Sequence, residues 1–256
     1  MTLTIDPTVS RNHLAECHAL DAHLRAWAEA QGADERQFTI LIAADALRRA
    51  EYPDAFPQLL LAPAAAADPE QPLTSANASL IEWFLSPAVC YHAYLEFSGC
   101  TLRRGIAVTA RGHCFRREAP DDLALGCRQI EFQMRELILL GAPDWIEDRL
   151  RQIQPEVTAL ADSFRWPVEW RPACDPFFLP RSRGKAHLQR LKGTKIELCR
   201  PDGLALASIN RHADFFGTRF DIRLGNGEPA HTACVAFGLD RWAATLNEEN
   251  DAHERA

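Results

Sequence analysis

The stretch from Ile130 to Leu140 alternates between two kinds of side chain. Alternation with a period of two predicts a β-strand that turns one face toward a core. One face carries Ile130, Phe132, Met134, Glu136, Ile138 and Leu140, and the other carries Glu131, Gln133 and Arg135. Glu136 is therefore a carboxylate in an otherwise apolar row. A buried carboxylate needs a partner, so we expect Glu136 to contact either a cationic side chain, most simply an arginine, or a metal ion.

A second strand precedes this one and carries polar residues at alternate positions. Cys114, Arg116 and Glu118 share one face, and the Pro-Asp-Asp sequence at 120–122 then breaks the strand. The two strands are thus joined by a loop. Farther along the chain, several strands follow one another with few helices between them. This order predicts an α+β fold with a mainly antiparallel sheet flanked by helices.

The remaining elements are predicted from periodicity and from helix-start signals. Ser86 and Pro87 suit the N-cap and first position of a helix that ends at Gly99. Helical spacing of apolar residues predicts three more helices, over 11–31, 34–50 and 142–164. Strands are expected over 56–63, 101–118 and 165–173 and repeatedly within 195–225. The segment 231–246 reads as a strand, a glycine and a helix that begins near Asp240, before a polar tail at 247–256.

Length and composition bound the class of protein. The chain has 256 residues, of which 47% are hydrophobic, enough for one sizeable domain. Its net charge of −7 and its acidic pI argue against an extensive nucleic-acid-binding surface. No apolar run is long enough to cross a membrane and no secretory signal is recognisable, so we expect a cytoplasmic protein. The eight cysteines form no Cys-x-x-Cys pair and are expected to be reduced.

Two further features suggest binding. Cys90 falls in the first turn of the helix after Ser86, where the helix dipole stabilises a thiolate. This position suits a metal ligand or a nucleophile, and a buried core cysteine is an equally good interpretation. The segment 175–195 carries six Lys or Arg residues and a single acid, Asp175. It is either a solvated face or a docking patch for an acidic partner or a phosphate.

Three motifs resemble those of class II aminoacyl-tRNA synthetases. Phe115-Arg116-Arg117-Glu118, a loop and Phe132 to Glu136 resemble motif 2, and Gly238-Leu239-Asp240-Arg241 before a helix resembles motif 3. The helix at 36–50, followed by proline and a strand, resembles motif 1 more weakly. The similarity covers roughly 35–246 and is greatest to seryl-tRNA synthetases. It implies a single class II synthetase-like catalytic domain over 1–246, with the polar tail outside it.

Two cysteines narrow the resemblance. Cys90, Glu136 and Cys234 match the zinc ligands of archaeal-type seryl-tRNA synthetases and of the small amino acid:[carrier protein] ligases. Two thiolates and one carboxylate are three protein ligands, which leave a fourth zinc position open as in catalytic sites. About 35 residues precede motif 1, too few for a long tRNA-binding coiled coil. The resemblance therefore implies a zinc-dependent carrier-protein ligase that contains one Zn²⁺ per subunit.

The same resemblance implies roles for individual residues. Arg116 and Arg241 would be catalytic and would hold the α- and γ-phosphates of ATP. Glu118 would bind the adenine amino group and Phe132 would stack on adenine, although ordinary core packing would also explain Phe132. Mg²⁺ is expected to bridge the phosphates, and the candidate ligands are Glu197 and Asn210. Near these residues Ala207 occupies the position where the synthetases have a glutamate.

The implied reaction activates glycine or alanine as aminoacyl-AMP and transfers it to the phosphopantetheine thiol of a carrier protein. The carrier could dock near the basic residues Arg181, Arg183, Lys185, Arg190 and Lys192. A homodimer is expected, as for other class II catalytic domains, and neither tRNA nor a membrane is expected as a partner. The alternatives are a seryl-type tRNA ligase relative, a non-catalytic paralogue that binds an amino acid or adenylate, and an unrelated α+β domain with chance motifs.

Overall fold

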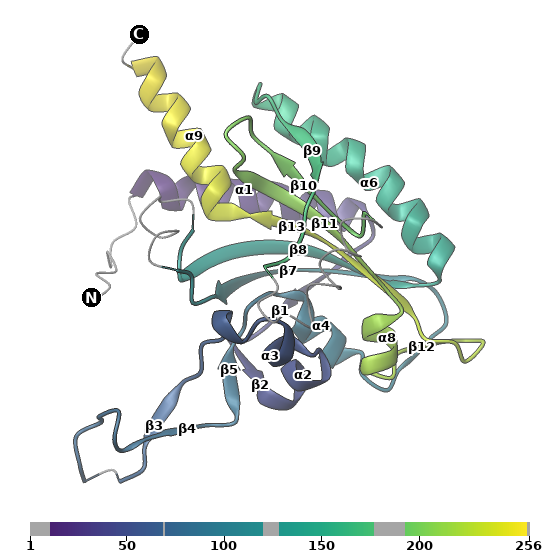
Figure 1. Ribbon diagram of the computed structural model, residues 1–256. Helices are drawn as coiled ribbons and strands as arrows, with labels where there is room; N and C mark the ends of the chain where they lie inside the picture. Colours follow the sequence, from purple (N-terminus) through teal and green to yellow (C-terminus); the bar gives the residue numbers. More distant parts are fainter. Residues whose placement is uncertain (1–10, 69, 120–127, 177–192, 255–256) are drawn as a thin grey trace.

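A seven-stranded sheet forms the centre of the computed structural model, which describes residues 11–68, 70–119, 128–176 and 193–254 (Figure 1). The strands lie in the order β1-β7-β8-β13-β11-β10-β9. Every neighbouring pair is antiparallel except β1 and β7, which are parallel. The predicted fold class, an α+β fold with a mainly antiparallel sheet flanked by helices, is confirmed.

The central strands have the following bounds: β1 Asp34–Gln37, β7 Ile106–Phe115, β8 Glu131–Gly141, β9 Glu169–Pro172, β10 Lys195–Cys199, β11 Ala205–Ala213 and β13 His231–Gly238. The short strands are β2 Leu41–Ala43, β3 Ala64–Ala66, β4 Ala78–Leu80, β5 Trp83–Leu85, β6 Thr101–Leu102 and β12 Arg223–Leu224. The helices are α1 Arg11–Ala30, α2 Ala44–Arg49, α3 Tyr52–Ala55, the 3₁₀ turn η1 Pro57–Leu59, α4 Cys90–Glu96, α6 Pro143–Ser163, α8 Phe215–Arg219 and α9 Leu239–Glu254.

The sheet separates two hydrophobic cores, and strand β8 contributes to both. Leu137 and Leu139 pack with α1, α6 and α9 on one side, whereas Ile138 and Leu140 pack with α2, α4 and α8 on the other. This arrangement follows from the alternation of a strand whose two faces are both covered. Figure 1 shows the same layering, with α1, α6 and α9 on one side of the sheet and the short helices on the other. The second side is the one that Glu136 faces.

Helix predictions succeed where apolar spacing is long and regular. The predicted helices at 11–31 and 142–164 are α1 and α6, and their buried residues include Cys17, Leu20 and Leu24 on α1. The predicted helix at 34–50 is wrong, because this segment divides into β1, β2 and the short α2. Residues 34–37 instead pair in parallel with β7. A few apolar residues at helical spacing do not outweigh hydrogen bonds with a distant strand.

Four other predictions at the local level are corrected. The segment 56–63 contains the turn η1 rather than a strand, and Phe215–Arg219 forms helix α8 within the region predicted as strands. Helix α4 begins at Cys90 and not after Ser86, whose hydroxyl donates to the carbonyl of Ala88. At the end of the chain, α9 continues to Glu254 through most of the stretch predicted as a polar tail.

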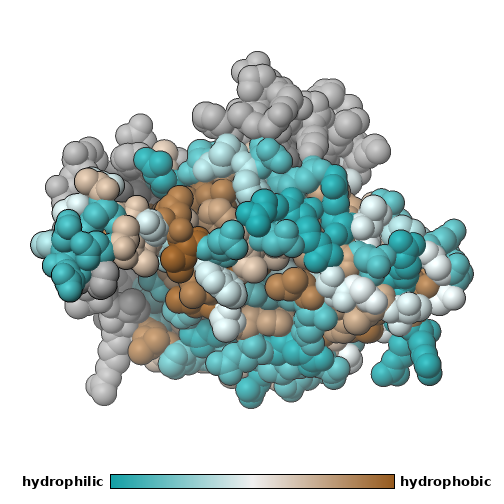
Figure 2. Space-filling view, turned by 90° about the horizontal axis from the view of Figure 1, so that it is seen from below, coloured by the Kyte–Doolittle hydropathy of each residue, from teal (hydrophilic) through white to brown (hydrophobic). Residues whose placement is uncertain are grey.

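Strands β3 and β4 form a two-stranded arm that projects from the body (Figure 1). Large hydrophobic side chains are exposed on the arm and around its base: Ile40, Leu80, Ile81 and Trp83. Seen from below, hydrophobic surface forms a band on the left of the view, toward the base of the arm (Figure 2). None of the helices in the described part of the chain has the length and apolar character needed to cross a membrane.

Candidate functional site

A cavity of about 700 Å³ opens on the Glu136 face of the sheet. Its walls come from the central strands, from α4 and α8, and from the segment around η1. All the residues that the sequence singled out for catalysis, nucleotide binding or zinc binding line it: Cys90, Arg116, Glu118, Phe132, Glu136, Glu197, Asn210, Cys234 and Arg241. The fold therefore brings together residues spread over most of the chain.

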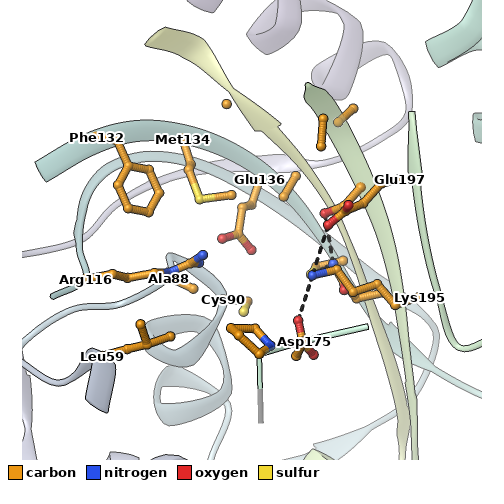
Figure 3. Close-up of a pocket in the computed structure, with 18 of the residues that line it drawn as sticks. Leu59, Ala88, Cys90, Arg116, Phe132, Met134, Glu136, Asp175, Lys195 and Glu197 are labelled. Carbon is orange, nitrogen blue, oxygen red and sulfur yellow. Dashed lines mark hydrogen bonds and ion pairs between the residues drawn. The ribbon is translucent and has the colours of Figure 1, made fainter. Parts of the chain in front are cut away.

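Cys90, Glu136 and Cys234 converge from three elements. Glu136 lies on β8 opposite Ala236 of β13, so Cys234, two residues earlier on β13, shares its face. Cys90 is the first residue of α4, which lies below this face, and Figure 3 shows Glu136 directed toward it. All three residues are buried, and one ligand atom from each lies within 4.8 Å of the other two. This is the separation at which a single metal ion could contact all three with small adjustments.

The hydrogen bonding of Glu136 leaves one carboxylate oxygen free. Its Oε1 accepts a bond of 2.9 Å from the backbone N–H of Val89, just before α4. Its Oε2 is buried and has no hydrogen-bond partner within 3.5 Å in the described part of the chain. Burial raises the pKa of Glu136, and the Val89 N–H opposes this effect. The expected ion pair with an arginine is not observed among the described residues, so a metal ion fits the orphaned oxygen better.

The thiol of Cys90 also lacks a counter-charge. Interaction with the thiol of Cys234, then burial and the charge of Glu136, raise the pKa of Cys90 well above its usual range. Two thiols and a carboxylate cannot all be anionic here without a cation. A divalent ion would supply that charge, and the sulfur and oxygen donors suit zinc. The residues present therefore fit a zinc ion.

Arg116 and Phe132 form one wall of the cavity. Arg116 follows β7, and its Nε donates to the carbonyl of Pro87 at 3.0 Å. Its guanidinium carbon lies 5.0 Å from the centroid of the Phe132 ring, a cation–π contact. The contact and the hydrogen bond hold the guanidinium against the wall in the close-up of the pocket (Figure 3). The ring of Phe132 is therefore a packing partner of Arg116 as well as a cavity surface.

Glu118 and Arg241 lie toward other parts of the same cavity. The carboxylate of Glu118 is nearly buried and accepts a bond of 2.8 Å from Arg128, a residue that the sequence did not single out. Arg241 is in the first turn of α9, and its Nη1 donates to the carbonyl of Ala205 at 2.9 Å. Arg128 and Arg241 thus line the same cavity as the carboxylate of Glu118.

The two candidate magnesium ligands lie on neighbouring strands with different partners. The amide of Asn210 on β11 donates to Ser208 Oγ at 3.1 Å and approaches Cys234 Sγ at 3.6 Å. Glu197 on β10 has its Oε1 3.2 Å from Lys195 Nζ. Asn210 is therefore placed to support the thiol of Cys234, and Glu197 to hold a lysine.

Lys195 is the main cavity residue that sequence reasoning missed. Its ammonium is 2.6 Å from Asp175 Oδ1 and 3.2 Å from Glu197 Oε1 (Figure 3). Burial lowers its pKa, but these two carboxylates outweigh burial and raise the pKa overall. Two sequence signals were available: Lys195 and Glu197 alternate along one face of a predicted strand, and Asp175 is the single acid of the basic segment 175–195. Neither signal indicates that Lys195 contacts Asp175, 20 residues earlier.

Aromatic residues close the end of the cavity near Cys90. Tyr91 and Phe216 stack edge to face, with ring centroids 5.8 Å apart. His212 on β11 lies 4.8 Å from the Phe216 ring and accepts or shares a hydrogen bond with the hydroxyl of Tyr94. Burial lowers the pKa of His212 to about 4, so this ring is neutral at physiological pH. The basic residues expected to dock a carrier, Arg181, Arg183, Lys185, Arg190 and Lys192, lie outside the described residues.

Comparison with known proteins agrees with the predicted resemblance. No family model matches the chain. It is 36% identical over 169 residues to amino acid–[acyl-carrier-protein] ligase 1 of Bradyrhizobium diazoefficiens, covering 63% of this chain and 51% of the relative. It is 34% identical to ligase 2 of the same organism, over 63% of this chain and 50% of the relative. The chain thus spans about half the length of the curated relatives it matches.

Two solved structures with the same fold are seryl-tRNA synthetases. The M. kandleri enzyme, solved with an A. aeolicus tRNASec, matches with a TM-score of 0.77 at 17% identity, over 93% of this chain and 53% of that one. The cytoplasmic serine-tRNA ligase of Naegleria fowleri, solved with AMP, matches with a TM-score of 0.68 at 11% identity, over 92% and 48%. The chain is therefore homologous to proteins named amino acid–[acyl-carrier-protein] ligases and has the class II seryl-tRNA synthetase fold.

Proposed function

We propose that this chain activates a small amino acid, glycine or alanine, with ATP and transfers it to the phosphopantetheine thiol of a carrier protein. The observation that carries the proposal is the convergence of a Cys-Glu-Cys set and two arginines on one cavity. The Cys-Glu-Cys set can hold a metal ion that binds the substrate amine, and the arginines can bind the phosphates of ATP and the substrate carboxylate. The names of the two curated relatives point to the same overall reaction.

In the first step, a carboxylate oxygen of the amino acid attacks the α-phosphorus of ATP, and pyrophosphate leaves with the electron pair of the broken P–O bond. Arg116 would hold the α-phosphate and the carboxylate, because its guanidinium is already oriented by Pro87 and Phe132. Arg241, which lines the same cavity, would bind the γ-phosphate. Glu118 would accept a hydrogen bond from the adenine amino group, with Arg128 holding its carboxylate in place.

Cys90, Glu136 and Cys234 would hold the zinc ion, and zinc would supply a Lewis-acidic position for the neutral amine of the substrate. Asn210 donates toward Cys234 and would support that thiolate. Tyr91, Phe216 and His212 crowd this end of the cavity, which supports a substrate with a small side chain.

Mg²⁺ would accompany ATP, with Glu197 and Asn210 as candidate ligands. Glu197 could serve if Lys195 shifted its contact toward Asp175 or toward a phosphate, since both contacts already exist. In the second step, the carrier thiol attacks the adenylate carbonyl, AMP leaves, and a thioester forms.

The exposed hydrophobic side chains at the arm support the predicted homodimer. The cytoplasmic location stays a prediction.

The decisive experiment is amino-acid-dependent exchange of pyrophosphate into ATP, measured for every amino acid with and without a zinc chelator. Exchange with glycine or alanine that the chelator abolishes supports the proposal, and the second step is then tested by loading of purified carrier proteins. Exchange with serine, together with aminoacylation of tRNA, would favour a tRNA ligase relative. A folded, zinc-loaded sample without exchange for any amino acid would overturn the enzymatic function.

A further inference from the structure

A second cluster of metal-binding residue types lies beside the cavity, which only one of its members, Asp240, lines. His13 and Cys17 are four residues apart on α1, and Asp240 is in the first turn of α9. One ligand atom from each of the three lies within 4.8 Å of the other two. Helices α1 and α9 are in contact, and Figure 1 shows them meeting at the base of α9. The cluster thus joins segments more than 200 residues apart in sequence.

The geometry is close to that of a zinc site. Residues four apart on a helix project from the same face, so His13 and Cys17 can reach one ion. His13 Nε2 lies 3.2 Å from Asp240 Oδ1. Two ligands at zinc distances of about 2.0–2.1 Å in a tetrahedron are roughly 3.3 Å apart, so these atoms need almost no movement. The nitrogen, sulfur and oxygen donors are all accepted by zinc.

The charge around the thiol also favours a cation. The charged neighbours of the Cys17 thiol include more carboxylates than cations: Asp240, Arg111, Glu16 and Asp21. Cys17 is fully buried, whereas the side chains of His13 and Asp240 are 19% and 15% exposed. Three protein ligands with partial solvent access leave room for a water molecule as the fourth ligand.

A hydrogen bond alone explains only part of the cluster. It accounts for the contact between His13 and Asp240, and Cys17 could donate a weak bond to the carbonyl of Leu239, 3.7 Å away. It does not account for a buried thiol beside a carboxylate and an imidazole on the same side. We propose that His13, Cys17 and Asp240 form a second divalent metal site, for Zn²⁺ or a similar transition metal, distinct from the Cys90 set.

The position of this site suggests what the metal does. The other oxygen of Asp240 accepts a hydrogen bond from the backbone of Gln133 on β8. Phe132 and Arg241 are proposed to bind ATP. Gln133 directly follows Phe132 in the chain, and Asp240 directly precedes Arg241. A metal ion here ties α1 to both segments and holds them at a constant spacing. Its role is structural, because its ligands do not all line the cavity.

The test removes each site separately and measures metal content by mass spectrometry of zinc-loaded, desalted protein. A Cys90→Ser, Cys234→Ser background lacks the first site and is still expected to retain about one equivalent of zinc. Adding His13→Ala should remove that equivalent and abolish the rise in melting temperature on zinc addition. His18→Ala, an exposed position on α1, is the matched control and should change neither quantity.

A second pair of variants gives an independent reading in the otherwise unmodified chain. Cys17→Ser should lower zinc content by about one equivalent, whereas Cys100→Ser, at an exposed cysteine, should not. If the buried Cys17 variant fails to fold by circular dichroism, the partly exposed His13 decides the question. Equal zinc content and thermal shift in His13→Ala and His18→Ala would overturn the proposal and leave a hydrogen-bonded pair. None of these readouts depends on adenylation, so the proposed function can fail without affecting them.

Discussion

Replacing Glu136 with glutamine tests whether this residue is a metal ligand or a member of a structural ion pair. Glutamine has the same size, and its carbonyl oxygen can still accept the hydrogen bond from Val89 N–H that Oε1 now accepts. The change removes the negative charge and places an amide NH₂ toward the two thiols. If Glu136 is a zinc ligand, zinc affinity must fall sharply while the metal-free fold survives.

The expected magnitudes can be worked out for both states. Zinc binding at four-ligand sites is worth about 10–16 kcal/mol, so one ligand contributes about 2.5–4 kcal/mol, or roughly 10²–10³-fold in affinity. In the metal-free protein, a neutral amide is easier to bury than a carboxyl group whose pKa burial already raises. The free energy of unfolding of metal-free Glu136→Gln should therefore lie within about 1 kcal/mol of wild type.

The assay combines competition for zinc against a chromophoric chelator with urea unfolding of the metal-free proteins. Glu131→Gln is the matched control, since Glu131 lies on the same strand but is exposed and pairs with His113. It should leave zinc affinity unchanged. The reasoning is refuted if Glu136→Gln keeps wild-type zinc affinity. It is also refuted if the metal-free variant loses about 3–5 kcal/mol, the cost of breaking a buried ion pair.

Three further predictions concern the fold. The absorbance of tyrosinate at 295 nm should stay low to about pH 11 in the folded protein. Burial raises the pKa of Tyr52 to about 12 and raises the pKa of the other two tyrosines, Tyr91 and Tyr94, as well. The unfolded chain releases these protons near pH 10, so stability is present below that pH and falls as pH rises further. Gly217→Ala should destabilise by at least about 3 kcal/mol in chemical unfolding, since a Cβ would lie 2.0 Å from the Ala230 carbonyl; a smaller loss would mean that α8 can shift. Arg135→Met should cost about 3 kcal/mol, because the buried guanidinium holds Asp21 at 2.6 Å and Glu35 at 2.8 Å, and unchanged stability would show that water replaces it.

The cavity residues were predictable where a local pattern accompanied them. Glu136 stood out because a charged residue interrupts the apolar face of a regular strand, and β8 has the predicted alternation. Cys90 stood out because it begins a helix, although that helix starts later than Ser86 suggested. Lys195 was missed, because its role depends on the ion pair with Asp175. The position of Asp175 in turn depends on how distant strands are aligned.

The same limit explains the element that was wrongly assigned. Residues 34–50 have enough apolar side chains at helical spacing to suggest a helix, but residues 34–37 hydrogen-bond to β7. Local propensity differs by a few tenths of a kcal/mol per residue, and pairing with an existing strand outweighs it. Nothing in the sequence of this segment shows that β7, some 70 residues later, lies within reach.

By itself the sequence determined the mainly antiparallel sheet, the alternation of β8 with its Glu136 face toward a core, and the identity of the polar residues available for chemistry. These follow from the period of side-chain directions along each segment, a property of the local backbone. Only the tertiary structure decided which of those residues meet. Cys90, Glu136 and Cys234 converge because of the β8–β13 register and the docking of α4, and His13, Cys17 and Asp240 converge because α1 packs on α9. Distances between residues far apart in sequence depend on register and packing, which no single segment encodes.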